Sequence, residues 1–215
     1  MAYRVVSISP TDGSGGEQLG TIVARELGFQ LVNEQIVAQA AREAGVDAAV
    51  VADVERRKSV LARLLEGLAE VGPAGASGFS GFAAITEDPG PRRDALRGLI
   101  TSVLSESADR GHAVIVAHAA SFALATRADV LRVLISASPP TRARRLAEAQ
   151  NIDQAEAEKL VARGDANRAD YLKRFYGVST ELPTHYDISI NTDRVAPEDA
   201  AALIVSAARS QQVPV

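Results

Sequence analysis

Three glycines among residues 13–16 mark the first place where this chain could do chemistry. Gly13, Gly15 and Gly16 follow an apolar, strand-like run, YRVVSIS, and open a helix-like segment, GEQLGTIVAREL. Glycine allows close backbone approach to a ligand, and the first N–H groups of a helix attract anions. With Ser14 between them, these glycines predict a cradle for phosphate groups. The alternative is a plain tight turn between a strand and a helix.

This turn lacks the lysine and hydroxyl of the P-loop pattern G-x-x-x-x-G-K-[ST]. When Gly15 takes the second glycine position, Pro10 falls on the first, Gly16 on the lysine and Glu17 on the hydroxyl. Asp12 and Glu17 flank the turn, and a carboxylate about 4 Å from a phosphate charge opposes it by roughly 4 kcal/mol at an effective dielectric of about 20. The dipole of the following helix stabilises a bound phosphate by only about 0.3–1 kcal/mol. We therefore expect weak triphosphate binding unless Glu17 points away or holds a metal ion.

Basic side chains follow two later strands of the expected sheet. His118 comes directly after one strand, and Arg142 and Arg145 open the helix after the next. Ligands of open α/β sheets bind beyond the carboxyl ends of the strands, so we expect His118, residues 13–16 and residues 136–138 to meet there. A hydrogen-bonded structural role for His118 is the alternative.

A second basic cluster lies in RGDANRADYLKRFYG, on or beside one helical segment. Arg168 and Tyr171 are three residues apart and share a helix face. A solvated surface with local ion pairs is the alternative for such a cluster. Its candidate site residues are Arg163, Asp165, Arg168 and Tyr171.

Composition narrows the class of protein. A chain of 215 residues with 47% hydrophobic residues suits one α/β domain with a sizeable core. A net charge of −4 and 4% aromatic residues do not favour nucleic-acid or membrane binding, so we expect a small-molecule ligand. The chain has no cysteine, no secretion-signal pattern and no apolar run of membrane-spanning length, which favours the cytoplasm. No H-E-x-x-H or G-x-S-x-G pattern occurs, so we expect neither a zinc site nor a serine hydrolase.

Short β-branched runs alternate with helical patterns, as in a parallel sheet covered by helices. One segment, residues 72–91, is rich in glycine and proline and is expected to be a loop, either a lid or a disordered linker. Before it, Leu61, Leu64, Leu65 and Leu68 form an apolar stripe that is either core or the seam of a homodimer. The expected strands are 5–9, 29–32, 113–117, 130–136 and 187–191, and the expected helices are 16–27, 33–44, 48–71, 92–110, 140–150, 153–163, 167–175 and 197–208.

The order of these segments resembles the cytidylate kinase-like family, a branch of the P-loop nucleoside monophosphate kinases. The resemblance rests on SISPTDGSGGEQLG, VIVAHAASFALA, VLRVLISASPPTRARRL, AEKLVARGDANRADYLKRFYG and YDISINTDR, and spans nearly the whole chain. It implies one P-loop kinase-like α/β domain of three layers, with a five-stranded parallel sheet flanked by helices. It also implies a helical insert with a flexible loop over about residues 33–91 and a lid over about residues 151–178.

The resemblance further implies a site. Asp165 and Arg168 match the lid motif D-x-x-R and become the expected catalytic residues, with Arg168 neutralising charge on the transferred phosphoryl group. ATP and Mg²⁺ are the expected cofactors of an active enzyme, and a nucleoside monophosphate is the expected kind of acceptor. The residues expected at phosphate or nucleotide are Gly13, Ser14, Gly15, Gly16, His118, Arg142, Arg145, Arg163 and Tyr171, with no protein metal ligand.

Two departures from the family pattern remove positive charge. The branch commonly reads GSGGRE, whereas Glu17 stands here at the arginine, and it commonly reads GRG where this chain has Ala117, His118 and Ala119. One transition-state cation is worth several decades in rate, each about 1.4 kcal/mol, so these losses predict a very slow kinase or none. Two hypotheses stay open: a phosphotransferase using Mg-ATP, and a catalytically inactive kinase-fold protein that binds a nucleotide, another anion or a protein partner.

Overall fold

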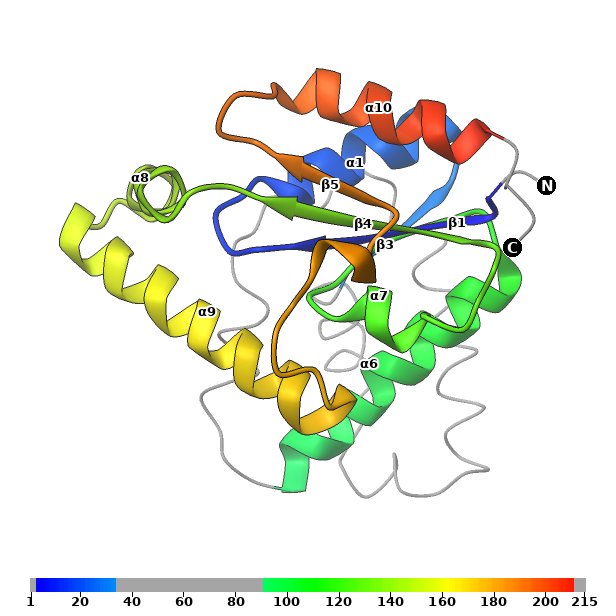
Figure 1. Cartoon of the computed structure of the whole chain (residues 1–215), viewed down its shortest axis with the longest axis horizontal. Helices are drawn as coiled ribbons and strands as arrows, with labels where there is room; N and C mark the ends of the chain where they lie inside the picture. Colours follow the sequence, from blue (N-terminus) through cyan, green and yellow to red (C-terminus); the bar gives the residue numbers. More distant parts are fainter. Residues whose placement is uncertain (1–2, 34–90, 211–215) are drawn as a thin grey trace.

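The centre of the fold is a five-stranded sheet in which all neighbouring strands run parallel. The computed structural model describes residues 3–33 and 91–210. The strand order is β2-β3-β1-β4-β5, so β1 lies in the middle (Figure 1). The five-stranded parallel sheet expected from the sequence is confirmed. The strands are β1 Val5–Pro10, β2 Gln30–Asn33, β3 Ala113–Val116, β4 Val130–Ser136 and β5 Ile188–Asn191.

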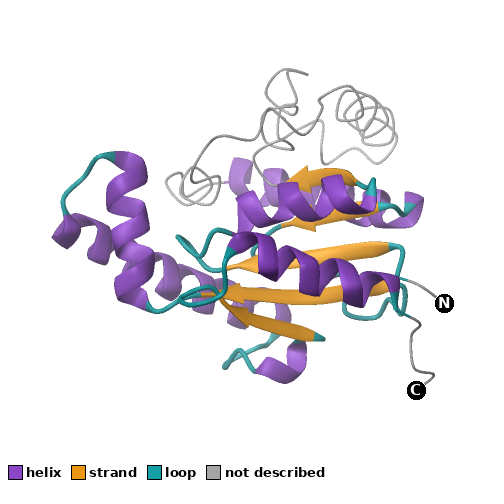
Figure 2. Cartoon of the chain, turned by 90° about the horizontal axis from the view of Figure 1, so that it is seen from above, coloured by secondary structure: helices purple, strands orange, loops and turns teal. Residues whose placement is uncertain are grey.

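Helices cover both faces of the sheet and give the fold three layers (Figure 2). Helices α1 and α10 pack together on one face, and α6 and α7 lie on the other. Helices α8 and α9 pack against each other and extend beyond the carboxyl ends of the strands (Figure 1). The helices are α1 Gly16–Leu27, α6 Pro91–Arg110, α7 Ala120–Ala123, α8 Pro139–Gln150, α9 Gln154–Tyr176 and α10 Pro197–Arg209, with a 3₁₀ turn, η2, at Pro183–His185.

Strand β1 is buried along its whole length and contacts both helical layers. Val6 and Ile8 belong to the core shared with α1 and α10. The alternate residues Ser7 and Ser9 face α7, where the Ser121 hydroxyl lies 3.3 Å and 2.9 Å from their hydroxyls. This packing fixes the strand that leads into the glycine turn, which we define as residues 10–16.

Helix α1 approaches the sheet closely because residue 20 is glycine. A Cβ atom on Gly20 would collide with Cγ2 of Val116 on β3. At its far end, α1 stops at Gly28, whose φ of 68° is the left-handed conformation that favours glycine at a helix C-terminus. Both ends of α1 are thus set by glycine, and its N-terminus stays directly behind the turn.

The segment expected to be a lid, about residues 151–178, departs from the predicted secondary structure. The sequence predicts two helices, 153–163 and 167–175, but the structure has one continuous helix, α9. Asp153 caps it by accepting a hydrogen bond from the N–H of Glu156 at 2.8 Å, and Gly177 ends it at φ 67°. Gly164 and the two residues after it belong to α9. The gap predicted between residues 163 and 167 is therefore wrong.

Most other predicted boundaries within the described residues lie within two residues of the observed ones, and α1 and β4 match them. Helix α7 and the turn η2 are not among the predicted ranges, and Asn33, expected to begin a helix, ends β2. The expected helices 33–44 and 48–71, the leucine stripe and the loop 72–91 fall almost wholly outside the described residues. Within residues 3–33 and 91–210, no helix is both long and apolar enough to cross a membrane.

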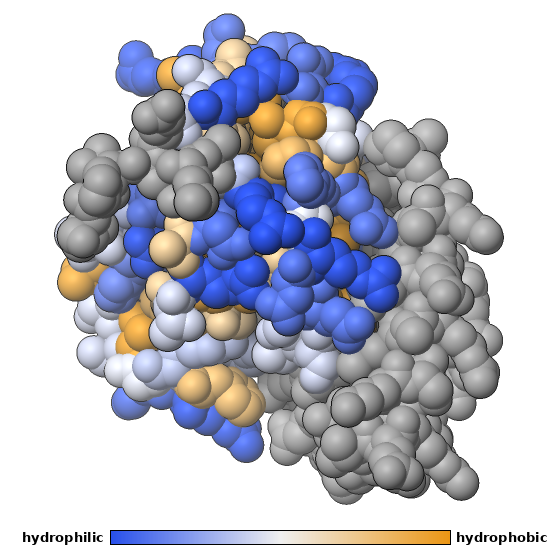
Figure 3. All heavy atoms as spheres, turned by 90° about the vertical axis from the view of Figure 1, so that its right-hand side faces the viewer, coloured by the Kyte–Doolittle hydropathy of each residue, from blue (hydrophilic) through white to orange (hydrophobic). Residues whose placement is uncertain are grey.

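The amino ends of the strands form a mainly hydrophilic face. Arg127 precedes β4 and donates to both carboxylate oxygens of Asp129 at 3.1 Å, to the carbonyl of Ala108 at 3.0 Å, and to Asp109. Figure 3 looks at this end of the molecule, where hydrophilic side chains dominate the described surface. Arg127, Asp109 and Asp129 are thus paired with one another. The glycine turn, where the sequence predicts the site, lies at the opposite end of the sheet.

Candidate phosphate-binding site

The glycine turn connects β1 to α1 at the carboxyl edge of the sheet. Gly13 and Gly15 have φ angles of 76° and 85°, which residues with a Cβ rarely adopt. A Cβ on Gly13 would lie 2.7 Å from the carbonyl oxygen of Arg142, and one on Gly16 would collide with Pro10. Glycine is therefore needed at position 13 for both backbone conformation and space, at position 15 for conformation, and at position 16 for space.

The turn offers backbone N–H groups at the N-terminus of α1. Among the described residues, the N–H groups of Gly13, Gly15 and Gly16 have no hydrogen-bond partner, whereas that of Ser14 donates to Thr11 O at 3.0 Å. The Ser14 hydroxyl is buried and also has no partner within the described chain. Amides of this kind, with the positive end of the helix dipole behind them, suit an anion.

The carbonyl groups of the same turn are held by side chains from three other parts of the chain. Arg168 on α9 donates to Pro10 O at 3.2 Å, and Arg142 on α8 donates to Asp12 O at 3.4 Å. Arg145 donates to Gly13 O at 3.4 Å, and Thr192, just after β5, donates to Ser14 O at 2.8 Å. The cations that the sequence associates with phosphate thus contact the carbonyls of the turn.

Arg168 lies in a buried ion pair. It is 6% exposed, and its Nε and Nη2 donate to the two carboxylate oxygens of Glu181 at 2.8 Å and 2.6 Å. Tyr186 joins this cluster by accepting from Arg168 at 3.2 Å and donating to Glu181. Burial alone would raise the pKa of Glu181, but the hydrogen bonds and charge of Arg168 outweigh it and lower that pKa. Burial is also the main reason that the pKa of Tyr186 is raised.

Arg142 and Asp165 join α8 to α9. The Arg142 side chain is only 5% exposed, and its Nη1 and Nη2 donate to the two Asp165 oxygens at 2.9 Å and 2.6 Å. Asp165 itself is 44% exposed and reaches solvent. Of the two residues predicted to be catalytic, Asp165 is thus paired with Arg142 and Arg168 with Glu181.

Asp12 links the turn to both β3 and α9. Its Oδ1 lies 2.9 Å from His118 Nε2, and its Oδ2 lies where a Cβ on Gly164 would be. Burial opposes ionisation of Asp12, but the hydrogen bond and charge of His118, with the charges of Arg168 and Arg142, lower its pKa overall. The predicted meeting of His118 with the turn is therefore present, through Asp12.

Glu17 is directed toward β2. Its Oε2 accepts a hydrogen bond at 2.8 Å from Nδ2 of Asn33, a fully buried residue at the end of that strand. The side chain therefore stands on the β2 side of the turn, with an amide partner that partly offsets its charge.

The remaining predicted site residues lie on α9 and at the end of β4. Arg163 is exposed on α9, and the Tyr171 ring lies 4.8 Å from that of Phe175 by ring centroids. Residues 136–138 reach the turn through Thr192 and Arg142, which donate to Ser136 O at 2.8 Å and to Ala137 O at 3.1 Å. Ser138 N donates to Asp193, after β5, at 3.0 Å. Sequence reasoning missed Glu181, Asn33 and the contacts of Thr192, although Thr192 belongs to the quoted motif YDISINTDR.

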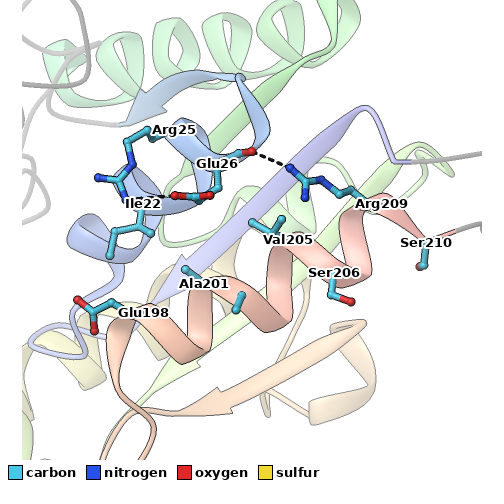
Figure 4. A pocket seen from close by; sticks show the side chains of 10 residues that line it. Ile22, Arg25, Glu26, Glu198, Ala201, Val205, Ser206, Arg209 and Ser210 are labelled. Carbon is cyan, nitrogen blue, oxygen red and sulfur yellow. Dashed lines mark hydrogen bonds and ion pairs between the residues drawn. The ribbon is translucent and has the colours of Figure 1, made fainter.

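A surface pocket of about 590 Å³ lies between α1 and α10, away from the glycine turn (Figure 4). It is open and lined by apolar, charged and hydroxyl side chains, and Arg209 closes one end by donating to Glu26 O at 2.8 Å. Among the described residues, no three His, Asp or Glu side chains are grouped as a metal site. The glycine turn therefore remains the candidate site.

Comparisons with known proteins agree with this fold. An uncharacterized protein from Eubacterium ventriosum ATCC 27560 is similar at 15% identity, over 96% of this chain and 99% of that one, with a TM-score of 0.64. Shikimate kinase from Bacteroides thetaiotaomicron is similar at 16% identity, over 95% and 98% of the two chains, with a TM-score of 0.53. At such identities the likeness shows the fold alone. No curated protein sequence matches the chain.

A family model gives the more specific result. Residues 5–194 match the model of the cytidylate kinase-like family, which covers the sheet, the glycine turn, α8, α9 and the segment after β5. The match includes every predicted site residue. The chain belongs to the cytidylate kinase-like family.

Proposed function

We propose that this protein binds the phosphate groups of a nucleotide at the glycine turn and transfers the γ-phosphoryl group of ATP to a nucleoside monophosphate or a similar small acceptor. The observation that carries the proposal is the set of N–H groups of Gly13, Gly15 and Gly16 at the start of α1, which have no partner in the described chain. Family membership supports the kind of reaction.

The backbone amides and carboxylates at the glycine turn are types of group that bind Mg-ATP, although the lysine and hydroxyl of the P-loop pattern are absent. The amides of the turn would hold phosphate oxygens, and the carboxylates of Asp12 and Glu17 are of the ligand type that Mg²⁺ prefers. Bound Mg²⁺ would neutralise charge on the transferred group. Without a metal ion, the same two carboxylates would oppose the phosphates. We therefore expect nucleotide binding to depend strongly on Mg²⁺.

Arg168 would have to exchange one anion for another. Glu181 holds it through two parallel hydrogen bonds, the arrangement that arginine also makes with a phosphate. A phosphoryl group within reach could replace Glu181 when the lid closes. Arg168 would then stabilise the developing charge. Further basic side chains in contact with the turn are Arg142, Arg145 and, through Asp12, His118.

A transfer assay with γ-³²P-ATP, Mg²⁺ and a panel of nucleoside monophosphates tests this proposal. The wild type should label an acceptor, and Arg168→Lys should lose at least about tenfold in turnover because lysine lacks the bidentate fork. Arg174→Lys, on the exposed side of the same helix, is the matched control and should behave as the wild type. A wild type without transfer, or an Arg168→Lys variant at full rate, would refute catalysis by this site.

A second function is favoured by the pairing of the basic residues. Arg142 and Arg168 are each held by a carboxylate, and Glu17 brings negative charge to the turn. These contacts suit a protein that binds a nucleotide or another anion without turnover. Binding of Mg-ATP without transfer to any acceptor, together with tighter ATP binding by Glu17→Arg, is the result expected from this alternative.

A further inference from the structure

Thr192, just after the last strand, contacts the glycine turn, and this contact suggests a role for Thr192 in the phosphate cradle. Thr192 follows β5 and is 6% exposed. Its N–H donates to Ser136 O at 2.8 Å, which fixes its backbone to the end of β4. Its hydroxyl then reaches Ser14 O at 2.8 Å, a residue 178 positions away in the sequence. A side chain near the C-terminal end of the fold thus holds the glycine turn, which lies near the N-terminal end of the fold.

Arg145 determines where the proton of the Thr192 hydroxyl points. Arginine can only donate, and Arg145 Nη1 lies 3.0 Å from Thr192 Oγ1, so the hydroxyl accepts there. Its single proton must go to another acceptor. Ser14 O at 2.8 Å is nearer than Ser136 O at 3.2 Å, which already accepts the Thr192 N–H. Arg145 also donates to Thr192 O at 2.7 Å and to Gly13 O at 3.4 Å.

Holding a carbonyl fixes the N–H group of the next residue. In a planar trans peptide, the C=O of one residue and the N–H of the next point in opposite directions. When Thr192 holds Ser14 O on the outer side of the turn, the N–H of Gly15 must point to the inner side. Gly15 has no side chain, and nothing lies within 4 Å of where its Cβ would be, so packing at that position does not hold this peptide.

We infer that Thr192, oriented by Arg145, is a positioning residue that aims the Gly15 N–H group into the phosphate cradle. The inference deepens the proposed function and rests on it only for the binding of ATP, because the orientation of the peptide exists without ligand. Arg142 makes the corresponding contact with Asp12 O, which precedes the Gly13 N–H. The N–H groups of the turn are then oriented by residues that need not contact the phosphate.

Two variants of Thr192 separate this role from simple packing. Thr192→Val keeps the shape but removes the hydroxyl, whereas Thr192→Ser keeps the hydroxyl and removes a methyl group. Thr126→Val, which removes a hydroxyl at an exposed position before β4, at the opposite end of the sheet from the turn, is the control. The amide ¹⁵N–¹H NMR spectrum of the unliganded protein reports the Gly15 peptide, and calorimetric titration with Mg-ATP reports the cradle.

We expect the Gly15 cross-peak to move in Thr192→Val and to stay near its wild-type position in Thr192→Ser and Thr126→Val. We expect Mg-ATP affinity to fall by up to about tenfold in Thr192→Val alone, the effect of one hydrogen bond. An unmoved Gly15 cross-peak in Thr192→Val, or a Thr192→Ser variant as defective as Thr192→Val, overturns the inference. If Thr192→Val does not fold, Arg145→Gln must move the same cross-peak, and failure to do so is equally decisive.

The two proposals fail in different ways. A wild type that binds no Mg-ATP refutes the proposed function, while the Gly15 cross-peak still decides the role of Thr192. A wild type that binds Mg-ATP, with Thr192→Val binding equally well and with an unmoved cross-peak, refutes the role of Thr192 alone.

Discussion

At the scale of single residues, the negative charges around the glycine turn each have a partner. Asp12 faces His118, and Glu17 faces Asn33. The sequence predicts the repulsion between these carboxylates and a phosphate, but not their partners, because His118 is 106 positions from Asp12. The glycine positions were predictable because their backbone requirement is local. The pairing of Arg168 with Glu181 was not, because it depends on how the chain returns after α9.

Gly164 is required by the contact of α9 with Asp12, and a double-mutant cycle tests this. Alanine usually stabilises an exposed helix by about 0.5–1 kcal/mol relative to glycine. Here the added Cβ would collide with Asp12 Oδ2, and moving this carboxylate away would disturb its hydrogen bond with His118, so we expect Gly164→Ala to lower the free energy of unfolding by about 0.5–1.5 kcal/mol.

In an Asp12→Ala background the same change should be neutral or stabilising, because the colliding carboxylate is gone. Urea unfolding of the four proteins measures the coupling. Equal effects of Gly164→Ala in both backgrounds would show that Asp12 does not touch the helix.

Glu181 should make stability depend on pH. Its pKa is below the usual 4.5 in the folded state, because Arg168 outweighs the effect of burial. A carboxyl with a depressed folded pKa stabilises the fold above its unfolded pKa, and this contribution is lost as pH falls through the folded pKa. Glu181→Gln should therefore be less stable than the wild type at neutral pH, with the difference shrinking below a pH of about 4.5.

Urea unfolding across that pH range, with Glu148→Gln on the exposed face of α8 as control, measures the effect. A constant difference between Glu181→Gln and the wild type at every pH would mean that the charge of Glu181 plays no part.

At the scale of elements, hydrophobic patterns predict the sheet well and α9, in the expected lid, less well. The strands are short apolar runs bounded by turn residues, and β1 and β3 are wholly buried, so their ends follow from local sequence within two residues. Helix α9 was predicted as two helices because Gly164 lowers helix propensity. Its caps at Asp153 and Gly177 and its packing on α8 outweigh that local effect. Tertiary contacts, which a sequence pattern does not contain, decide such cases.

The pair formed by Arg142 and Asp165 should hold α8 and α9 together. Asp165→Ala would leave the buried guanidinium of Arg142 without its carboxylate, and we expect a loss of about 1–3 kcal/mol in the free energy of unfolding. Asp170→Ala, an exposed position on the same helix, is the control and should change stability far less. Chemical denaturation compares the two variants, and equal small losses would show that the pair contributes little.

At the scale of the whole molecule, the topology brings distant residues to one edge of the sheet. Strand β1 lies between β3 and β4, so the glycine turn, His118 and the start of α8 meet at the carboxyl ends of these strands. This convergence was predictable from the order of strands and helices. The arrangement of basic side chains behind the turn was not, because it depends on the packing of α8, α9 and the segment after β5.

The most direct test of the account is a calorimetric titration of the purified wild type with Mg-ATP, beside Gly15→Ala. The alanine has room for its methyl group but strains a backbone held at φ 85°, so it disturbs the turn without a collision. The account predicts saturable binding at one site by the wild type and markedly weaker binding by Gly15→Ala. No binding by the wild type, or equal affinity of the two proteins, would contradict the claim that the glycine turn is a phosphate cradle.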